Sequence, residues 1–349
     1  MSSYAIGVDL GGTNLRIAAV STEGQLIEKI TTSTQVARGR DQVITEMCAA
    51  IRQLAQKFPG TILGVGVGVP GIIDMDSGMV HESPNLPGWA NFPVRDAIQQ
   101  QLGKPVILEN DANSAALGEK WLGSAREVES VCMLTLGTGV GGGIVLGGKI
   151  WHGMNGMAAE LGHIAVGPDG PVCGCGSRGC LEQWASATAV KRMAVEAIAR
   201  GEAPDLGRAM REDPEFSARI VFQMAQQGDG AAQKIFRRVG EALGIVIADL
   251  VNIFNLPMYL IGGGVSGAWE AFAPNMMDEV RRRSFVYSAT APDPTLPAKK
   301  KTIITRALLG SDAGLFGAAR LPMLQAEAEP AALTSRDVLD PSKKENRRD

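Results

Sequence analysis

The chain has 349 residues, a formal net charge of −3 at pH 7 and 20% charged residues, a composition typical of a globular protein long enough for two domains. The acidic balance argues against a nucleic-acid binder, and no apolar run approaches the roughly 20 residues that cross a bilayer. The amino-terminus shows no secretory signal. We therefore expect a cytoplasmic protein that binds neither nucleic acid nor membrane.

The first part of the chain predicts a meander of strands followed by alternating helices and strands. Short apolar runs that end at glycine or turn residues indicate strands, and apolar side chains at helical spacing indicate helices. The predicted elements are, in order, strands at 4–10, 15–20 and 26–32, a helix at 41–58, strands at 61–71 and 104–111, and a helix at 112–123.

At Val131 the pattern restarts. VCMLTLGTGVGGGIVLGGKI aligns with IGVDLGGTNLRIAAVSTEGQLI, so that Asp9 falls opposite Thr135 and Gly11 opposite Gly137. The alignment predicts a duplicated β-meander, although two unrelated glycine-rich hairpins would give a similar pattern. Further helices are expected at 187–200 and 218–254, and a strand followed by a glycine turn at 258–267.

These elements predict an α/β protein of two domains. The predicted parts are a small amino-terminal domain at 1–115, completed by a helix near 310–322, a larger domain at 116–309, and a tail at 325–349. The tail is polar and lacks periodicity, so we expect it to be disordered.

Three glycine-rich turns follow apolar strands, at 9–14 (DLGGTN), 136–143 (LGTGVGGG) and 261–267 (IGGGVSG). Such turns present backbone N–H groups that bind anions, although any one of them is also compatible with a plain tight hairpin. None is a P-loop or a clear dinucleotide-binding motif. Together they favour a polyphosphate site formed by glycine turns of both predicted domains. Asp9 is suited to hold Mg²⁺ through water, although it could also simply cap its own turn.

Asn110 and Asp111 lie between a predicted strand and a predicted helix. Ligand sites in α/β folds gather at the carboxyl ends of strands, and a helix amino-terminus favours an ionised carboxylate. Asp111 is therefore a candidate general base for an attacking hydroxyl group. The alternative is an ordinary helix N-cap.

Three of the five cysteines lie within CGCGSRGC, at Cys173, Cys175 and Cys180. Together with His163 they form the pattern H-x9-C-x-C-x4-C, and a Cys₃His set is a common structural zinc site. A disulfide between Cys173 and Cys175 would be cramped and would leave one cysteine over. The neighbouring acids Glu160 and Glu182 are candidates for holding sugar hydroxyls, because a fixed carboxylate accepts their hydrogen bonds well; ordinary surface charge is the alternative.

With these motifs in order, the chain resembles the ROK family of sugar kinases and repressors, and within it the bacterial glucokinases. The matching pieces are DLGGTN, VPG at 69–71, SPNLPGW at 83–89, ENDAN at 109–113, LGTGVGGGIVLGGKIWHG at 136–153, ELGH at 160–163, CGCGSRGCLE at 173–182 and IGGG at 261–264. The resemblance implies an actin/hexokinase-like fold, in which two RNase H-like α/β domains flank a central cleft.

The resemblance also implies roles for individual residues. Asp111 would be the general base. The sugar would be held by Gly71, Asn85, Asn110, Asp111, Glu160, His163 and Glu182. Phosphate and Mg²⁺ would face Asp9, Gly11, Gly12, Thr13, Gly137, Thr138 and Gly139, with Gly262, Gly263 and Gly264 near the adenosine. Structural Zn²⁺ would be bound by His163, Cys173, Cys175 and Cys180.

The activity implied is ATP-dependent phosphorylation of glucose at its 6-hydroxyl in a cytoplasmic homodimer. Phosphorylation of N-acetylglucosamine, N-acetylmannosamine, fructose or allose is an alternative, as is a non-catalytic sugar sensor or repressor. Repressors of the family carry an amino-terminal helix-turn-helix domain, for which the strand beginning by Tyr4 leaves no room, and a mere sensor needs neither a base nor a phosphate turn.

Overall fold

The computed structural model describes residues 3–58 and 60–336. The chain forms two compact units. Unit 1 comprises the residues up to Asp111 and the segment from Leu315 onward, and unit 2 comprises Ala112–Gly314. Relative to the predicted division at 115/116, the chain leaves unit 1 earlier, and it returns later than residue 310. The cleft expected between the domains stays a prediction.

Unit 1 is built on a five-stranded sheet with the order β3-β2-β1-β4-β7. The first three strands pair antiparallel, whereas β1, β4 and β7 are parallel. The strands are β1 (Ser3–Leu10), β2 (Asn14–Ser21), β3 (Leu26–Ser33), β4 (Thr61–Val69) and β7 (Val106–Asn110), with a separate hairpin of β5 (Ile72–Asp74) and β6 (Met79–Glu82). The helices are α1 (Arg40–Lys57), α2 (Val94–Leu102) and α11 (Ala313–Arg336). The carboxyl ends of the three parallel strands meet at one edge of the sheet.

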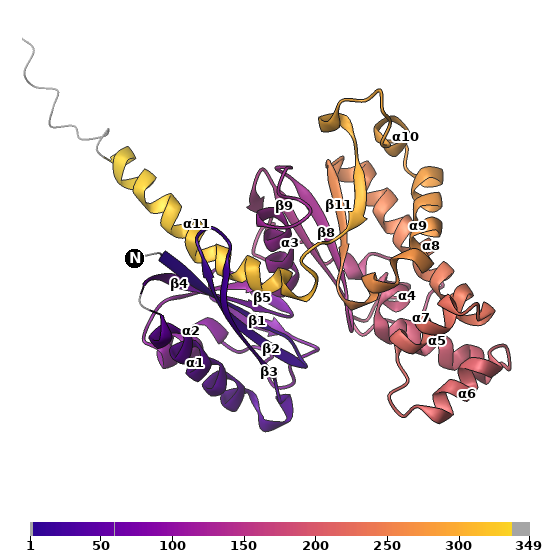
Figure 1. Cartoon of the computed structure of the whole chain (residues 1–349), viewed down its shortest axis with the longest axis horizontal. Coiled ribbons are helices and arrows are strands. Elements are labelled where there is room, and N and C mark those ends of the chain that lie inside the picture. Colours follow the sequence, from indigo (N-terminus) through magenta and orange to yellow (C-terminus); the bar gives the residue numbers. More distant parts are fainter. Residues whose placement is uncertain (1–2, 59, 337–349) are drawn as a thin grey trace, which may run out of the picture. The chain divides into compact units, whose positions relative to one another are not determined.

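Helices cover both faces of this sheet (Figure 1). On one face, α1 and α2 pack against the alternate apolar residues of β1, which include Ile6 and Val8. On the other face lies α11. A Cβ atom on Gly66 would lie 1.9 Å from the carbonyl oxygen of Ala318, so glycine in β4 is what allows the helix backbone to rest directly on the strand.

Unit 2 repeats this sheet with the order β10-β9-β8-β11-β12. Its strands are β8 (Val131–Leu136), β9 (Val140–Leu146), β10 (Lys149–Ile150), β11 (Met258–Gly262) and β12 (Ile303–Arg306). Its helices are α3 (Asp111–Trp121), α4 (Glu182–Ala185), α5 (Ala187–Ala199), α6 (Pro204–Glu212), α7 (Ala218–Gln226), α8 (Gly230–Phe254), α9 (Trp269–Arg283) and α10 (Tyr287–Thr290), with short 3₁₀ turns that include η2 (Leu161–His163) and η3 (Gly264–Ala268).

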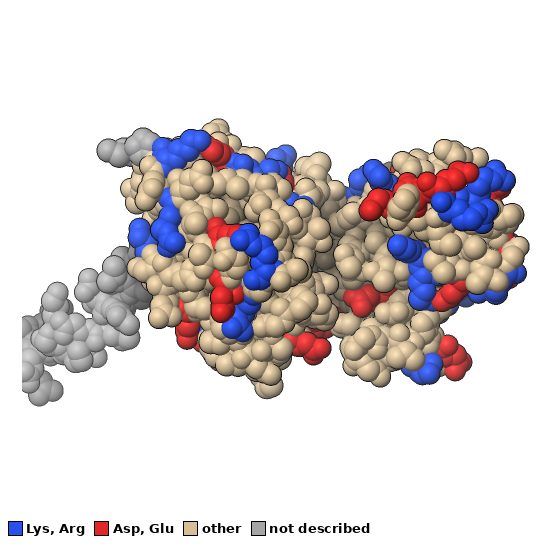
Figure 2. All heavy atoms as spheres, turned by 90° about the horizontal axis from the view of Figure 1, so that it is seen from below, with Lys and Arg blue, Asp and Glu red and all other residues tan. Residues whose placement is uncertain are grey.

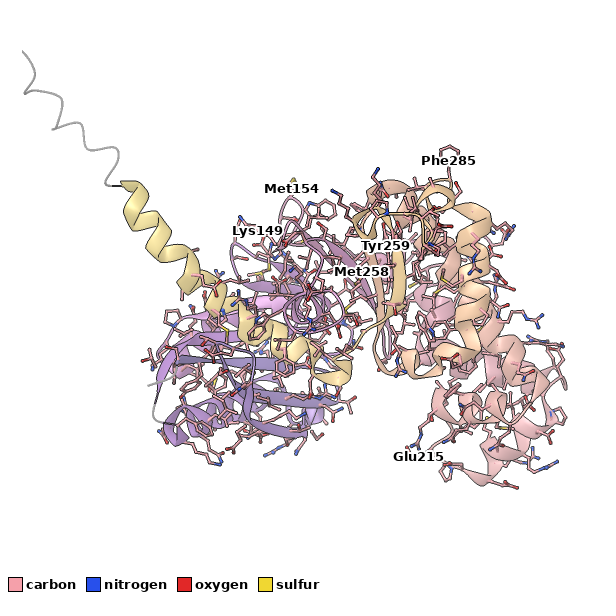
Figure 3. The ribbon with its side chains drawn as sticks, turned by 45° about the horizontal axis from the view of Figure 1, so that its top comes forward. Lys149, Met154, Glu215, Met258, Tyr259 and Phe285 are labelled. Carbon is pink, nitrogen blue, oxygen red and sulfur yellow. The ribbon has the colours of Figure 1, made fainter. Side chains whose placement is uncertain are left out.

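The core of unit 2 forms around the sheet and the long helix α8. Tyr259 of β11 is fully buried, in contrast to the exposed Phe285 and Met154 (Figure 3). Its hydroxyl donates to the carbonyl oxygen of Leu250, at 3.0 Å, and accepts from the amide of Leu256, at 3.1 Å. The buried phenol therefore ties the end of α8 to the strand that follows it.

The two sheets have the same topology, which confirms the predicted duplication and the fold class. In both, three antiparallel strands are followed by two parallel ones. Asp9 pairs with Gly68 across β1 and β4, and Thr135 pairs with Gly262 across β8 and β11. Asp9 and Thr135 therefore occupy equivalent positions, as the sequence alignment predicted.

Each repeat ends in a helix that packs in the other unit. The helix that follows the first sheet is α3, which lies in unit 2, where a Cβ on Gly143 would be 2.5 Å from the carbonyl oxygen of Ala112. The helix that follows the second sheet is α11, which from Leu315 onward belongs to unit 1. The exchange brings the chain out of unit 1 immediately after Asp111.

Two predicted elements need correction. The single helix expected at 218–254 is two helices, because Gly228 adopts a left-handed conformation (φ 95°) and Asp229 caps α8 by accepting from the amide of Ala232 at 2.7 Å. The tail expected to be disordered from residue 325 is helical as far as Arg336, as the continuation of α11. The rest of that predicted tail, 337–349, lies outside the described residues.

Over residues 3–58 and 60–336, none of the helices combines the length and apolar character that a membrane span requires. Lys and Arg side chains are interspersed with Asp and Glu on the face shown in Figure 2. All five cysteines are free thiols. Cys48 and Cys132 are buried among apolar side chains.

Candidate functional site

In unit 1 the candidate residues gather at the carboxyl edge of the parallel strands. Gly68 lies between Asp9 and Glu109 in the register of the sheet, and Asn110 pairs with Val69. The side-chain amide of Asn110 donates to the carbonyl oxygen of Gly71 at 3.2 Å. The VPG turn is therefore hydrogen-bonded directly to the ENDAN segment.

Gly71 has a positive φ of 119°, and a Cβ there would lie 2.2 Å from the carbonyl oxygen of Glu82. Ser83 fixes the same turn from the other side, because its hydroxyl donates to Pro70 at 2.7 Å. The start of the SPNLPGW segment is thus held against the end of β4. Only glycine fits position 71 without displacing this contact.

The first glycine turn is closed by hydrogen bonds from its own hairpin and from Thr34. The amide of Gly11 donates to Asn14 at 2.9 Å, and the buried Thr34 donates its hydroxyl to the carbonyl oxygen of Gly11 at 2.6 Å. A Cβ on Gly12 would lie 2.6 Å from the carbonyl oxygen of Asn85. Asn85 and the glycine turn are consequently neighbours, with Thr13 exposed at the tip.

Asp9 makes an ion pair that the sequence analysis missed. A terminal nitrogen of Arg16 lies 2.9 Å from Asp9 Oδ2, and the two side chains are 23% and 15% exposed. The signal was available, because Arg16 is the residue opposite Asp9 in the hairpin that turns at residues 11–14. The edge therefore carries a cation beside its acid, and both charges can contribute to binding a metal-bound phosphate.

Asp111 is the first residue of α3 and directly follows the last residue of β7. Its side chain is half-buried. A helix amino-terminus stabilises negative charge by typically 0.3–1 kcal/mol, which favours the carboxylate form. An ionised carboxylate at a strand end beside a glycine turn is chemically able to accept a proton.

In unit 2 the other two glycine turns are side by side. Leu134 pairs with Ile261 and Thr135 with Gly262, so β8 and β11 end together. Gly263 has φ 80°, and a Cβ there would lie 2.5 Å from the carbonyl oxygen of Leu136, the residue before the second turn. The turns at 137–139 and 262–264 thus form one backbone surface, with Thr138 and Gly264 exposed on it.

The side chains of His163, Cys173, Cys175 and Cys180 are close enough to share one metal ion. One ligand atom from each residue lies within 4.8 Å of all the others. The Cys175 and Cys180 sulfurs are 3.7 Å apart, and Cys173 Sγ is 3.7 Å from His163 Nδ1. Tetrahedral zinc with bonds of about 2.3 Å to sulfur separates its ligand atoms by roughly 3.8 Å, so the cluster fits zinc.

The cluster thiols differ in acidity. Burial raises the pKa of Cys180 to about 12, whereas a backbone hydrogen bond from Ser177 lowers the pKa of the exposed Cys175. A metal binds the thiolate form and releases the proton. Because Nδ1 of His163 faces the cysteines, its Nε2 is the ring atom left for another ligand.

Both candidate acids lie beside the cluster. Glu182 Oε1 is 3.9 Å from Cys173 Sγ, and its Oε2 accepts from the amide of Val140 at 3.0 Å. Desolvation by surrounding protein raises the pKa of Glu160, although part of the residue stays exposed; the charge of Glu182 adds to this rise, and His163 opposes it. The charges of Glu160 and Glu182 are therefore close enough to act on each other beside the cluster.

The candidates thus form two groups, one in each unit. Unit 1 brings together Asp9, Gly11, Gly12, Thr13, Gly71, Asn85, Asn110 and Asp111, and unit 2 brings together Gly137, Thr138, Gly139, Glu160, His163, Cys173, Cys175, Cys180, Glu182, Gly262, Gly263 and Gly264. Whether the two groups face one ligand stays a prediction.

Residues 5–324 match the family model described as "ROK family". The chain belongs to the ROK family. It is 39% identical over 317 residues to a glucokinase from Thermotoga maritima, a match that covers 90% of this chain and 96% of the relative. A glucokinase from Streptomyces griseus, solved with glucose and AMPPNP, is 34% identical with a TM-score of 0.76, and the match covers 91% and 98% of the two chains. A xylose repressor from Caldicellulosiruptor bescii is 34% identical, over 80% of this chain and 71% of the repressor.

Proposed function

We propose that this ROK protein is a glucokinase that transfers the terminal phosphoryl group of ATP to the 6-hydroxyl of glucose. The observation that carries the proposal is the edge of unit 1, where Asp111 begins a helix directly after Asn110, whose side chain is hydrogen-bonded to the turn of Gly71. Supporting it, relatives named glucokinase match over most of both chains, and a related glucokinase was solved with glucose and AMPPNP.

In the proposed mechanism Asp111 accepts the proton of the 6-hydroxyl while the sugar oxygen forms its bond to the γ-phosphorus and the bond to the ADP oxygen breaks. Proton acceptance comes late, because phosphoryl transfer depends mainly on positioning and charge neutralisation. Asp9 would hold Mg²⁺ through water, with Arg16 offsetting part of its charge. The backbone amides of the glycine turns would take the phosphates.

Sugar hydroxyls would be bound by Gly71, Asn85, Asn110, Asp111, Glu160, His163 and Glu182, and adenosine would lie against the turn at 262–264. Zinc bound by His163 and the three cysteines would supply a structural crosslink and no step of the reaction, because four protein ligands leave no open position. The donor set and its spacing support this assignment. We also propose a homodimer in a reducing cytoplasm that engages neither nucleic acid nor membrane.

The test is phosphoryl transfer by the purified, zinc-loaded protein. ATP and Mg²⁺ are offered with glucose, N-acetylglucosamine, N-acetylmannosamine, fructose and allose, and products are identified by ³¹P NMR. We expect glucose to be the substrate with the largest kcat/KM and glucose 6-phosphate to be its product. Larger kcat/KM for another hexose would replace the substrate assignment, and no transfer to any of the five would refute a hexose kinase.

A further inference from the structure

The segment that follows the Cys/His cluster holds the glycine turn at 137–139. The amide of Ala187 donates to the carbonyl oxygen of Gly137 at 2.8 Å, and the hydroxyl of Thr188 donates to that of Thr138 at 2.8 Å. The third bond is the one from the Val140 amide to Glu182. Residues only two to eight positions after Cys180 therefore bond to both sides of this turn.

Glu182 contacts both the Cys/His cluster and the glycine turn at 137–139. Its Oε1 lies toward the sulfur of Cys173 and its Oε2 toward the backbone at the end of the turn. A Cβ on Gly139 would be 2.3 Å from Oε2, so the carboxylate lies directly against the turn backbone. This contact leaves one oxygen of Glu182 bound to protein, whatever the other oxygen binds.

The cluster has two arms, one chain segment that carries Cys180 and one that carries His163. The arm that carries His163 also contacts Val140 of β9. A Cβ on Gly162 would lie 2.0 Å from the carbonyl oxygen of Val140, and Gly162 is the residue before His163. The backbone of Val140 is therefore held at its amide by the arm that carries Cys180 and at its carbonyl by the arm that carries His163.

From these contacts we infer that Glu182 is a positioning residue through which metal in the Cys/His cluster fixes the glycine turn at 137–139. A metal ion crosslinks the two arms, and the crosslinked arms hold Val140 on both sides. Without the metal the arms move independently and the turn loses its fixed geometry. The role of that turn in nucleotide binding rests on the proposed function, whereas the link between metal and turn does not.

Amide exchange at Val140 tests the link directly. Loss of a hydrogen bond to a charged acceptor should speed exchange by about 10- to 100-fold in Glu182→Ala and in the zinc-stripped wild type. Glu182→Gln should remain near the wild type, because its amide oxygen can still accept. Unchanged exchange after zinc removal would overturn the inference, and this comparison needs no variant to fold.

Nucleotide affinity tests the consequence. AMPPNP binding, measured calorimetrically without sugar, should weaken by about tenfold or more on zinc removal from the wild type, and zinc removal should have little further effect in Glu182→Ala. Glu196→Ala is the matched control, because this acid pairs with Arg192 on the following helix; its affinity should keep the full zinc dependence. Equal zinc dependence in Glu182→Ala and the wild type would refute Glu182 as the link. If the zinc-loaded wild type binds no AMPPNP, the proposed function fails, and Val140 exchange alone decides this inference.

Discussion

The two units solve the same problem of holding a glycine turn in different ways. In unit 1 the chain passes from β3 to α1 through residues 34–39, and the turn is closed by Thr34 and by the backbone of Asn85. In unit 2 residues 151–229 separate β10 from α8, and they contain the whole Cys/His cluster. Two sheets of the same topology thus differ in what accompanies them: unit 1 has an acid with its ion pair, and unit 2 has a Cys/His cluster that fits a metal ion.

The largest expected effect removes the acid at the edge of unit 1. Asp111→Ala should lower kcat by about 10²–10⁴ if the carboxylate is a general base, with a much smaller loss of glucose affinity and with thermal unfolding near that of the wild type. Steady-state kinetics and calorimetry with glucose measure both. The isosteric Asp111→Asn should behave alike, and normal turnover in either variant would remove the base assignment.

The second change breaks the cluster of unit 2. Cys175→Ser should lower zinc affinity by at least about tenfold and weaken glucose binding with it, because the loop carries Glu160 and Glu182. Metal content by mass spectrometry and glucose titration give the two readings. Cys48→Ala, in the buried face of α1, should leave both unchanged. Full glucose affinity in a metal-free Cys175→Ser protein would reduce the cluster to scaffold.

A third variant separates packing from chemistry. Gly66→Ala should lower the free energy of unfolding by about 1–3 kcal/mol, because its Cβ would meet the Ala318 carbonyl. Gly230→Ala is the opposite control, since a Cβ there meets nothing within 4 Å and alanine stabilises a helix by up to about 1 kcal/mol. Denaturant titration measures both. A stable Gly66→Ala protein would mean that α11 is loosely seated.

The smallest effect concerns the ion pair between Arg16 and Asp9 at the edge of unit 1. Arg16→Gln should cost about 1–2 kcal/mol of stability, because it leaves Asp9 partly buried without its cation. It should also raise the KM for MgATP more than the KM for glucose. A larger effect on glucose would place this edge nearer the sugar than the phosphates.

Sequence patterns predicted the strands that end in glycine turns, because short apolar runs ending in glycine are local signals, whereas β5, β6 and β12 were missed. The cluster was equally readable from spacing alone, since its three cysteines lie within one short loop. Helices α2, α4, α6, α9 and α10 were missed, and Gly228 was not predicted to break a helix. The bond between Glu182 and Val140 could not be predicted, because it joins residues far apart in sequence through backbone geometry.

The exchange of closing helices has a consequence for the halves of this protein. A polypeptide made of the first repeat alone would end in α3, a helix shaped for the other sheet, and its own sheet would lack α11. The first and the second repeat could complete each other only by exchanging their closing helices, α3 and α11. The continuous chain makes that exchange permanent, so a cut within 122–130, after α3 and before β8, should yield fragments that recover their structure together and not apart.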